Sequence, residues 1–158
     1  MSWYYETPVL VDIPGWLFAG HTHLDLASAV KADVSLQRFT VVPRHFYIDA
    51  TFRCLRCHQE FCFTVVEQKY WYEDCRFTVN SYPRRCPACR RELRRRNALR
   101  QEYDHNISAT LRSPDCAAKQ RLIDIIDELR EVGIILPQKT LDNRQRLAAQ
   151  IARLSKST

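Results

Sequence analysis

The chain has 158 residues, of which 46% are hydrophobic and three are glycine, with a formal net charge of +6. This composition is that of a folded protein with one domain of ordinary size, or with a small metal-held core and appendages. No stretch approaches the roughly 18 consecutive apolar residues that a membrane span needs, and residues 1–6 lack the basic start and apolar core of a signal peptide. We expect a cytoplasmic protein that is not inserted in a membrane.

The positive charge is concentrated in one short segment. Residues 1–83 hold seven basic and nine acidic residues, residues 84–104 hold eight and three, and residues 105–158 hold nine and six. Arginine outnumbers lysine, 19 to 5, and a guanidinium suits bidentate contact with phosphate or carboxylate better than an ammonium does. The charge pattern therefore indicates a partner that carries one of these anionic groups.

Residues 1–50 form a region rich in aromatic residues and proline, which we expect to pack on the core that follows. Short apolar runs at residues 9–13 and 39–42 lie between prolines, as short strands do. Residues 24–31, between those runs, fit a short helix. The pair His21 and His23 could share one metal ion if it lay on a strand, but no companion ligands can be identified.

Residues 51–104 contain two Cys-x-x-Cys pairs. The residues around the first pair, 51–53 and 61–63, alternate like the two arms of a hairpin. Thr64 and Glu67 match a capping box, which predicts a helix over residues 65–74 with Val66 and Tyr70 on its apolar side. Residues 77–79 are expected to return as a strand, and a helix without a breaker begins at residue 90.

Residues 105–158 are predicted to be a two-helix appendage. Apolar residues at 3/4 spacing favour helices over residues 114–132 and 141–155, and these would form an antiparallel hairpin. All 17 aromatic residues lie at or before Tyr103, so the hairpin is expected to pack with aliphatic side chains alone. It could cover the core or join two copies of the chain into a homo-oligomer.

The two Cys-x-x-Cys pairs supply the four thiolates of a closed tetrahedral Zn²⁺ site. Each pair wraps the backbone around one metal ion, and the 28 residues between the pairs leave room for a hairpin and a short helix. The alternative is four unrelated thiols, which this spacing makes the weaker interpretation. The predicted ligands of one structural zinc ion are Cys54, Cys57, Cys86 and Cys89.

This segment resembles a known family. The pattern Cys54-x-x-Cys57-x-x-x-Phe61-x-Phe63-Thr64-x-x-Glu67-Gln68, followed by Pro83-x-Arg85-Cys86-Pro87-x-Cys89-Arg90, is similar to the bacterial "probable zinc-ribbon" treble-clef family over about residues 45–100. The resemblance implies an α+β treble-clef fold whose four cysteines bind zinc. It implies no catalytic residues.

The other cysteines and one histidine were weighed as functional groups. Cys62, Cys75 and Cys116 have no ligand spacing to either pair, and we expect buried or incidental thiols. Cys116 lies in the first turn of a helix, where its thiol could be reactive. His105 follows the second cysteine pair, whereas a nuclease of the His-Asn-His type places its histidine between the pairs. These observations argue against an enzyme.

The arginines around the second cysteine pair are the other strong signal. On a helix, Arg91, Arg94 and Arg95 share a face that fits phosphate groups. The alternatives are a solvated helix paired with acids of the chain, or a patch for an acidic protein. The predicted surface for nucleic acid or an acidic partner consists of Arg84, Arg85, Arg90, Arg91, Arg94 and Arg95.

Two functions follow from these observations. The first is a non-enzymatic, zinc-stabilised binding module that contacts nucleic acid through its arginine-rich helix. The second is a protein-interaction factor (an adaptor, inhibitor or immunity-type protein) that uses the N-terminal region and the C-terminal helices. The fold expected in both cases is α+β, with a small treble-clef module, an aromatic N-terminal extension and a C-terminal helical hairpin.

Overall fold

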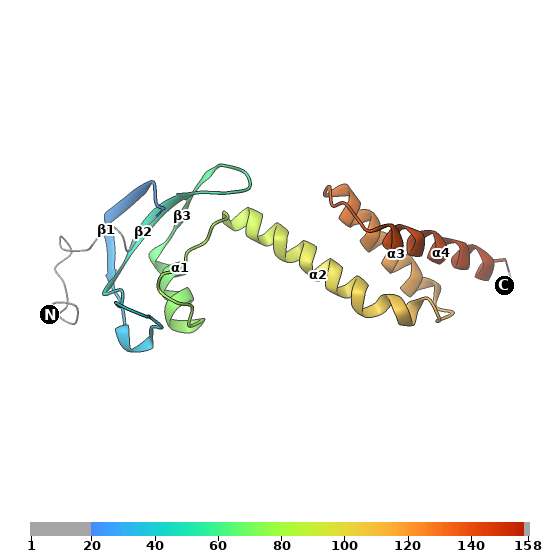
Figure 1. Cartoon of the computed structure of the whole chain (residues 1–158), viewed down its shortest axis with the longest axis horizontal. Coiled ribbons are helices and arrows are strands. Elements are labelled where there is room, and N and C mark those ends of the chain that lie inside the picture. The colour runs from blue at the N-terminus through green and yellow to red at the C-terminus, as the bar shows by residue number, and fades with distance from the viewer. Residues whose placement is uncertain (1–19, 157–158) are drawn as a thin grey trace. The chain divides into compact units, whose positions relative to one another are not determined.

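The computed structural model of the chain describes residues 20–156 (Figure 1). A three-stranded sheet is followed along the chain by the helices, which confirms the predicted α+β class. The chain divides into two compact units, Met1–Arg90 and Arg91–Thr158, and each is described by itself. The strand expected at residues 9–13 lies outside the described residues. No helix in the described part is both long enough and apolar enough to cross a membrane.

The first unit is built on an antiparallel sheet of β1 (His23–Lys31), β2 (Phe46–Arg53) and β3 (Glu60–Phe63), in that order. The hairpin predicted around the first cysteine pair is present as β2 and β3, with Phe52 opposite Phe61. Both phenylalanines are buried, because alternate positions of the two strands face the core. The hairpin therefore delivers its turn, and the cysteines on it, at one end of the sheet.

The helix predicted over residues 24–31 is wrong, because these residues form strand β1. The strand is irregular: pairing with β2 shifts between Asp25 and Val30. Ser28 stabilises the irregular part, since its hydroxyl donates to the Asp25 carbonyl and accepts from the Asp49 N–H. A short run with mixed apolar spacing fits either a helix or a strand, and pairing with β2 decides between them.

The helix predicted over residues 65–74 is present as α1 (Val65–Lys69) and a π-helical turn, η4 (Tyr70–Asp74). Thr64 caps it as expected and accepts from the Glu67 N–H. The predicted apolar side is wrong, because Val66 is 76% and Tyr70 57% exposed. The buried side carries Gln68, whose amide donates to the Ile48 and Phe63 carbonyls.

The two strands predicted at residues 39–42 and 77–79 are absent. The second of these segments makes one isolated bridge, between Thr78 and Arg38. A short 3-10 turn, η3 (Val34–Leu36), precedes the first segment. Both segments are therefore loops beside the three-stranded sheet rather than further strands of it.

The second unit consists of three helices, α2 (Pro87–Thr110) from Arg91 onward, α3 (Cys116–Glu131) and α4 (Gln138–Leu154). The two predicted C-terminal helices are present and pack together as α3 and α4. The prediction that these helices pack with aliphatic side chains alone is wrong. Tyr103 of α2 lies in the same core, and its hydroxyl accepts from the Asn143 amide. The domain boundary predicted after residue 104 falls inside α2.

A buried lysine ties the three helices of this unit together. Lys119 is 1% exposed, and its ammonium donates to the Thr110 carbonyl and to Gln150 Oε1, each at 2.7 Å. Gln150 in turn donates to the Leu111 carbonyl. Thr110 is the last residue of α2, so the ammonium binds a carbonyl at the negative end of the helix, which also accepts from the Ser113 N–H at 3.3 Å.

Replacing Lys119 by alanine should destabilise the helical unit by about 2–4 kcal/mol, because a cavity forms and two acceptors lose a charged donor. Urea unfolding followed by the helical circular-dichroism signal measures this loss. The matched control is K139A on the exposed start of α4, which should change stability by less than about 0.5 kcal/mol. Equal effects of the two variants would contradict the role of Lys119.

Candidate metal centre

The first cysteine pair lies on a tight turn at the end of β2. Cys54 follows the last residue of the strand, its N–H donates to the Gln59 carbonyl, and its own carbonyl accepts from the His58 N–H, both at 2.9 Å. His58 closes the turn with φ of +60°, which costs a residue other than glycine about 1–2 kcal/mol. The turn therefore needs support from outside its own backbone.

The second pair lies where α2 begins. Cys86 immediately precedes the helix and Cys89 is in its first turn. The loop leading to this pair is anchored at two carbonyls: Tyr72 donates to that of Ser81 at 2.5 Å, and Arg44 donates to that of Val79 at 2.7 Å. Because Tyr72 and Arg44 are themselves buried, the core of the first unit fixes the position from which α2 starts.

The two pairs meet at one point. The four sulfur atoms of Cys54, Cys57, Cys86 and Cys89 all lie within 4.8 Å of one another, and the Cys57 and Cys86 sulfurs are 3.8 Å apart. Metal–sulfur bonds of about 2.3 Å in a tetrahedron place the sulfurs about 3.8 Å apart. The observed spacing therefore fits four thiolates around one metal ion.

Backbone amides prepare this site for thiolates. The Arg56 N–H points at the Cys54 sulfur at 3.4 Å, and the Cys89 N–H at the Cys86 sulfur at 3.5 Å. The backbone N–H of Cys57, followed by those of Cys86 and Arg56, lowers the pKa of Cys54 to about 5 against the opposing effect of desolvation. One thiolate is thus favoured by the fold itself.

The neighbouring thiols oppose further ionisation. The pKa of Cys89 is raised to about 12, chiefly by its hydrogen bond with Cys86 and then by desolvation and by the other two sulfurs. Four thiolates this close together repel one another unless a cation lies between them. The donor set therefore fits a multivalent metal ion that bonds to all four sulfurs.

The remaining cysteines and the histidine pair do not join this cluster. Within residues 20–156, the four clustered cysteines are the one group of His, Cys, Asp or Glu side chains close enough to hold a metal ion. In this range, His21 and His23 do not form part of a group of three or more potential metal ligands. Of the two alternatives expected for the other cysteines, burial does not hold, because Cys62 and Cys116 are exposed and Cys75 is partly exposed.

Two of the predicted surface arginines are engaged within the chain. Arg90 forms an ion pair with Glu67, and its guanidinium lies over the Trp71 ring, 5.5 Å from the centroid. Its side chain is 17% exposed as a result. Arg95 forms an ion pair with Glu128 of α3. Sequence reasoning missed both contacts, since the partners are 23 and 33 positions away along the chain.

Three other predicted arginines are exposed, namely Arg84, Arg91 and Arg94, while Arg85 is half-buried. None of these four forms an ion pair with a residue in the described part of the chain. Helical spacing does not separate them from Arg95, because Arg95 follows Arg91 by four residues and so lies on the same side of the helix.

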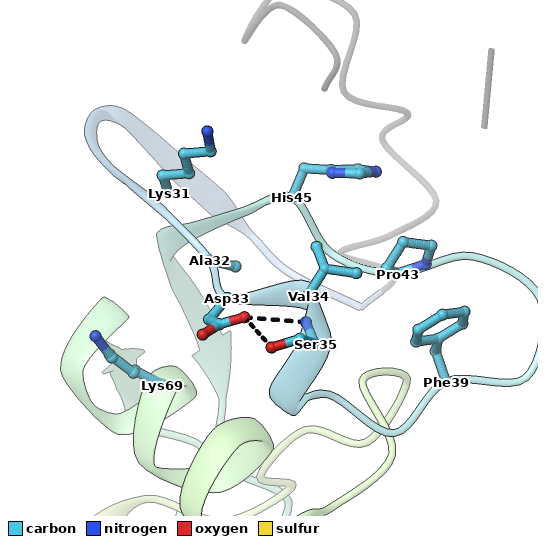
Figure 2. A pocket seen from close by; sticks show the side chains of 9 residues that line it. All are labelled: Lys31, Ala32, Asp33, Val34, Ser35, Phe39, Pro43, His45 and Lys69. Atoms are coloured by element: carbon cyan, nitrogen blue, oxygen red, sulfur yellow. Dashed lines mark hydrogen bonds between the residues drawn. The ribbon is translucent and has the colours of Figure 1, made fainter. Parts of the chain in front are cut away.

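A separate open hollow of about 580 Å³ lies beside β1, and Figure 2 shows its lining side chains. Lys31, His45 and Lys69 lie around it, and the Asp33 carboxylate accepts from the N–H and the hydroxyl of Ser35 (Figure 2). Lys69 also lies 3.8 Å from the carboxylate of Glu73. Two lysines and a histidine thus line the hollow against one aspartate, and no cluster of converging side chains in the described part of the chain assigns it a ligand.

Replacing Cys86 by serine should remove the bound metal and the cooperative unfolding of the first unit, since three thiolates and a hydroxyl bind metal far less tightly. Metal content by mass spectrometry and thermal unfolding by near-ultraviolet circular dichroism measure the two effects. C62S, on an exposed thiol of the adjacent strand, is the matched control and should keep the metal. A metal-free C86S variant that still unfolds cooperatively would contradict a structural role of the ion.

Comparison with known families supports this geometry. Residues 48–98 match the family model described as "Probable treble clef domain". Comparison with curated proteins and with solved structures gives no match for this chain. Knuckle, hairpin, short helix and a final pair of ligands at a helix start follow one another in the order that the sequence resemblance predicted. Residues 48–98 are therefore similar to a treble-clef domain, with four cysteines positioned to hold one metal ion.

Proposed function

We propose that this protein is a non-enzymatic, zinc-stabilised module that binds nucleic acid through an exposed basic face of α2. The observation that carries the proposal is that Arg91 and Arg94 are exposed on this helix without a carboxylate partner in the described chain. The treble-clef metal site lies at the start of the same helix.

Zinc is the ion that the donor set favours. Four thiolates in a tetrahedral arrangement are typical of structural Zn²⁺ sites, and harder cations prefer oxygen ligands. When bound, zinc would neutralise the thiolates and join the hairpin turn to the start of α2. A site with four protein ligands has no position for a substrate or a reactive water, so its contribution is to the fold. This supports binding rather than catalysis.

The basic face is defined here as the α2 ridge: Arg91, Arg94, Ala98, Gln101 and His105. These residues follow one another at intervals of three or four, so they lie along one side of the helix, and all five are exposed. None carries a negative charge, and Ala98 is too small to hold a ligand away from the helix. The ridge can therefore approach a polyanion closely along four turns.

The acids of α2 are either paired with an arginine, half-buried, or displaced around the helix from Arg94. Glu102 accepts two hydrogen bonds from Arg121 of α3, each at 2.8 Å, and these bonds lower the pKa of its carboxyl. Glu92 is half-buried. Asp104 is exposed but lies on a different side of the helix from Arg94. Glu102, the acid beside the ridge, is thus paired with Arg121, which leaves the net charge of the ridge positive, as phosphate groups require.

The protein-interaction alternative has its own observation. Val66, Tyr70 and Phe77 of the first unit are exposed apolar side chains, and such groups can contact another protein. The apolar residues of α3 and α4 are used inside the second unit, so a homo-oligomer through these helices remains a prediction. An acidic protein surface could also bind the α2 ridge, and the test below separates it from nucleic acid.

Replacing Arg91 and Arg94 by glutamine should weaken binding to a mixed-sequence duplex and flatten its salt dependence. Each lost phosphate contact reduces the slope of log K against log salt by about 0.9, so the double variant should lose nearly 2. Fluorescence anisotropy at several NaCl concentrations measures the slope. R146Q, on an exposed position of α4, is the matched control and should keep the slope of the wild type.

Two outcomes would refute nucleic acid as the partner. One is a wild-type protein whose retention by nucleic acid is too weak to measure at low salt. The other is a double variant that binds as tightly as the wild type, with an unchanged slope. Circular dichroism and zinc content confirm that the variant is folded.

A further inference from the structure

We propose that the turn of the first cysteine pair is a second contact surface, which places one apolar side chain in a groove of duplex nucleic acid between two phosphate-binding arginines. This knuckle surface consists of Leu55, Arg56 and Arg84. The inference rests on the proposed function, because it assumes a nucleic-acid partner. It adds a contact in the first unit, and it specifies a duplex rather than a single strand.

Leu55 is an exposed apolar residue on a rigid support. It lies between two metal-site cysteines, Cys54, which is fully buried, and Cys57, yet it is itself 65% exposed. Nothing in the packing of the first unit requires leucine there, since it does not belong to the core cluster. A side chain held on a metal-fixed turn loses little further freedom when it contacts a partner. Leu55 is thus an exposed apolar side chain, called the prong below, whose contact with a partner would cost little conformational entropy.

The second cysteine pair places an arginine beside this prong. The Leu55 N–H donates to the Arg84 carbonyl at 3.0 Å, so the backbones of the two pairs run next to each other at this point. Arg84 is exposed, and so is Arg56, the neighbour of Leu55 along the chain. Leu55 therefore has an exposed arginine as a neighbour on each of two segments of the chain.

The charge around the prong is predominantly positive. Arg56 and Arg84 form no ion pair with a residue that the structure describes. Arg53 adds a further exposed cation at the end of β2, and the acid opposite it in the sheet is Glu60. The surface therefore complements a polyanion whose charges lie on both sides of an apolar strip.

A duplex groove has this arrangement, with phosphates along its rims and bases and sugars between them. Proteins that enter such grooves combine arginine contacts with aliphatic wedges such as leucine, whereas surfaces for single strands present aromatic rings for stacking. The aromatic residue nearest to the second pair, Tyr82, is stacked on Phe52 at a centroid distance of 5.0 Å. An aliphatic prong without a free aromatic neighbour favours the duplex.

The experiment uses the zinc-loaded full chain, with one mixed-sequence DNA offered as a duplex and as a single strand. Burial of the leucine side chain predicts that L55A weakens duplex binding about fivefold to thirtyfold at every salt concentration, with an unchanged salt slope. Replacing Arg56 and Arg84 by glutamine should instead reduce the slope by nearly 2. V66A, which removes an apolar side chain that is 76% exposed on α1, and R38Q at an exposed loop position are the controls and should bind the duplex as the wild type does.

Three results would overturn the inference. If L55A binds the duplex as tightly as V66A does, Leu55 does not contact the duplex. If L55A loses as much affinity for the single strand as for the duplex, the surface is not specific for a duplex. If the variant at Arg56 and Arg84 keeps the wild-type slope of log K against log salt, these arginines do not contact phosphates. In each case a weakened R91Q/R94Q variant would leave the proposed function standing. A wild-type protein that binds no DNA refutes both proposals together. Zinc content shows that the variants keep their metal site.

Discussion

The arrangement of the first unit depends on the meeting of four sulfur atoms at one point. The fold brings the sulfurs within 4.8 Å of one another, a spacing at which four thiolates are stable together only around a cation. This requirement joins the turn after β2 to the start of α2, two segments that share one backbone hydrogen bond, from Leu55 to Arg84. The turn itself includes a left-handed His58. Metal binding is therefore coupled to the folding of this region.

The position of the metal site also affects which arginines of α2 are exposed. Because the second cysteine pair fixes the first turn of α2, the arginines beyond it emerge at set angles around the helix. Arg90 is then drawn to Glu67 and Trp71, and Arg95 to Glu128, while Arg91 and Arg94 remain exposed. On our proposal, the protein uses some arginines to hold its own structure and presents the others to a polyanion.

Local sequence signals were sufficient for the parts of the fold that local chemistry controls. The cysteine spacing predicted the metal site, Thr64 predicted the start of α1, and 3/4 spacing predicted α3 and α4. Contacts between distant residues could not be predicted. Strand β1 takes its form from pairing with β2, and the π-helical turn and Gln68 set the buried side of α1, which exposes Val66 and Tyr70. The ion pair between Arg95 and Glu128 joins residues on two helices, and one sequence does not reveal such a pairing.

Amide hydrogen exchange before and after removal of the metal tests the central claim most directly, because it reports on each unit separately. With zinc bound, the amides of β2, β3 and the first turn of α2 should be protected. After chelation, these amides should exchange at nearly unprotected rates, while those of α3, held by the core around Ile125, Ile126 and Leu147, keep their protection. Unchanged protection of β2 and β3 in the metal-free chain would contradict the account.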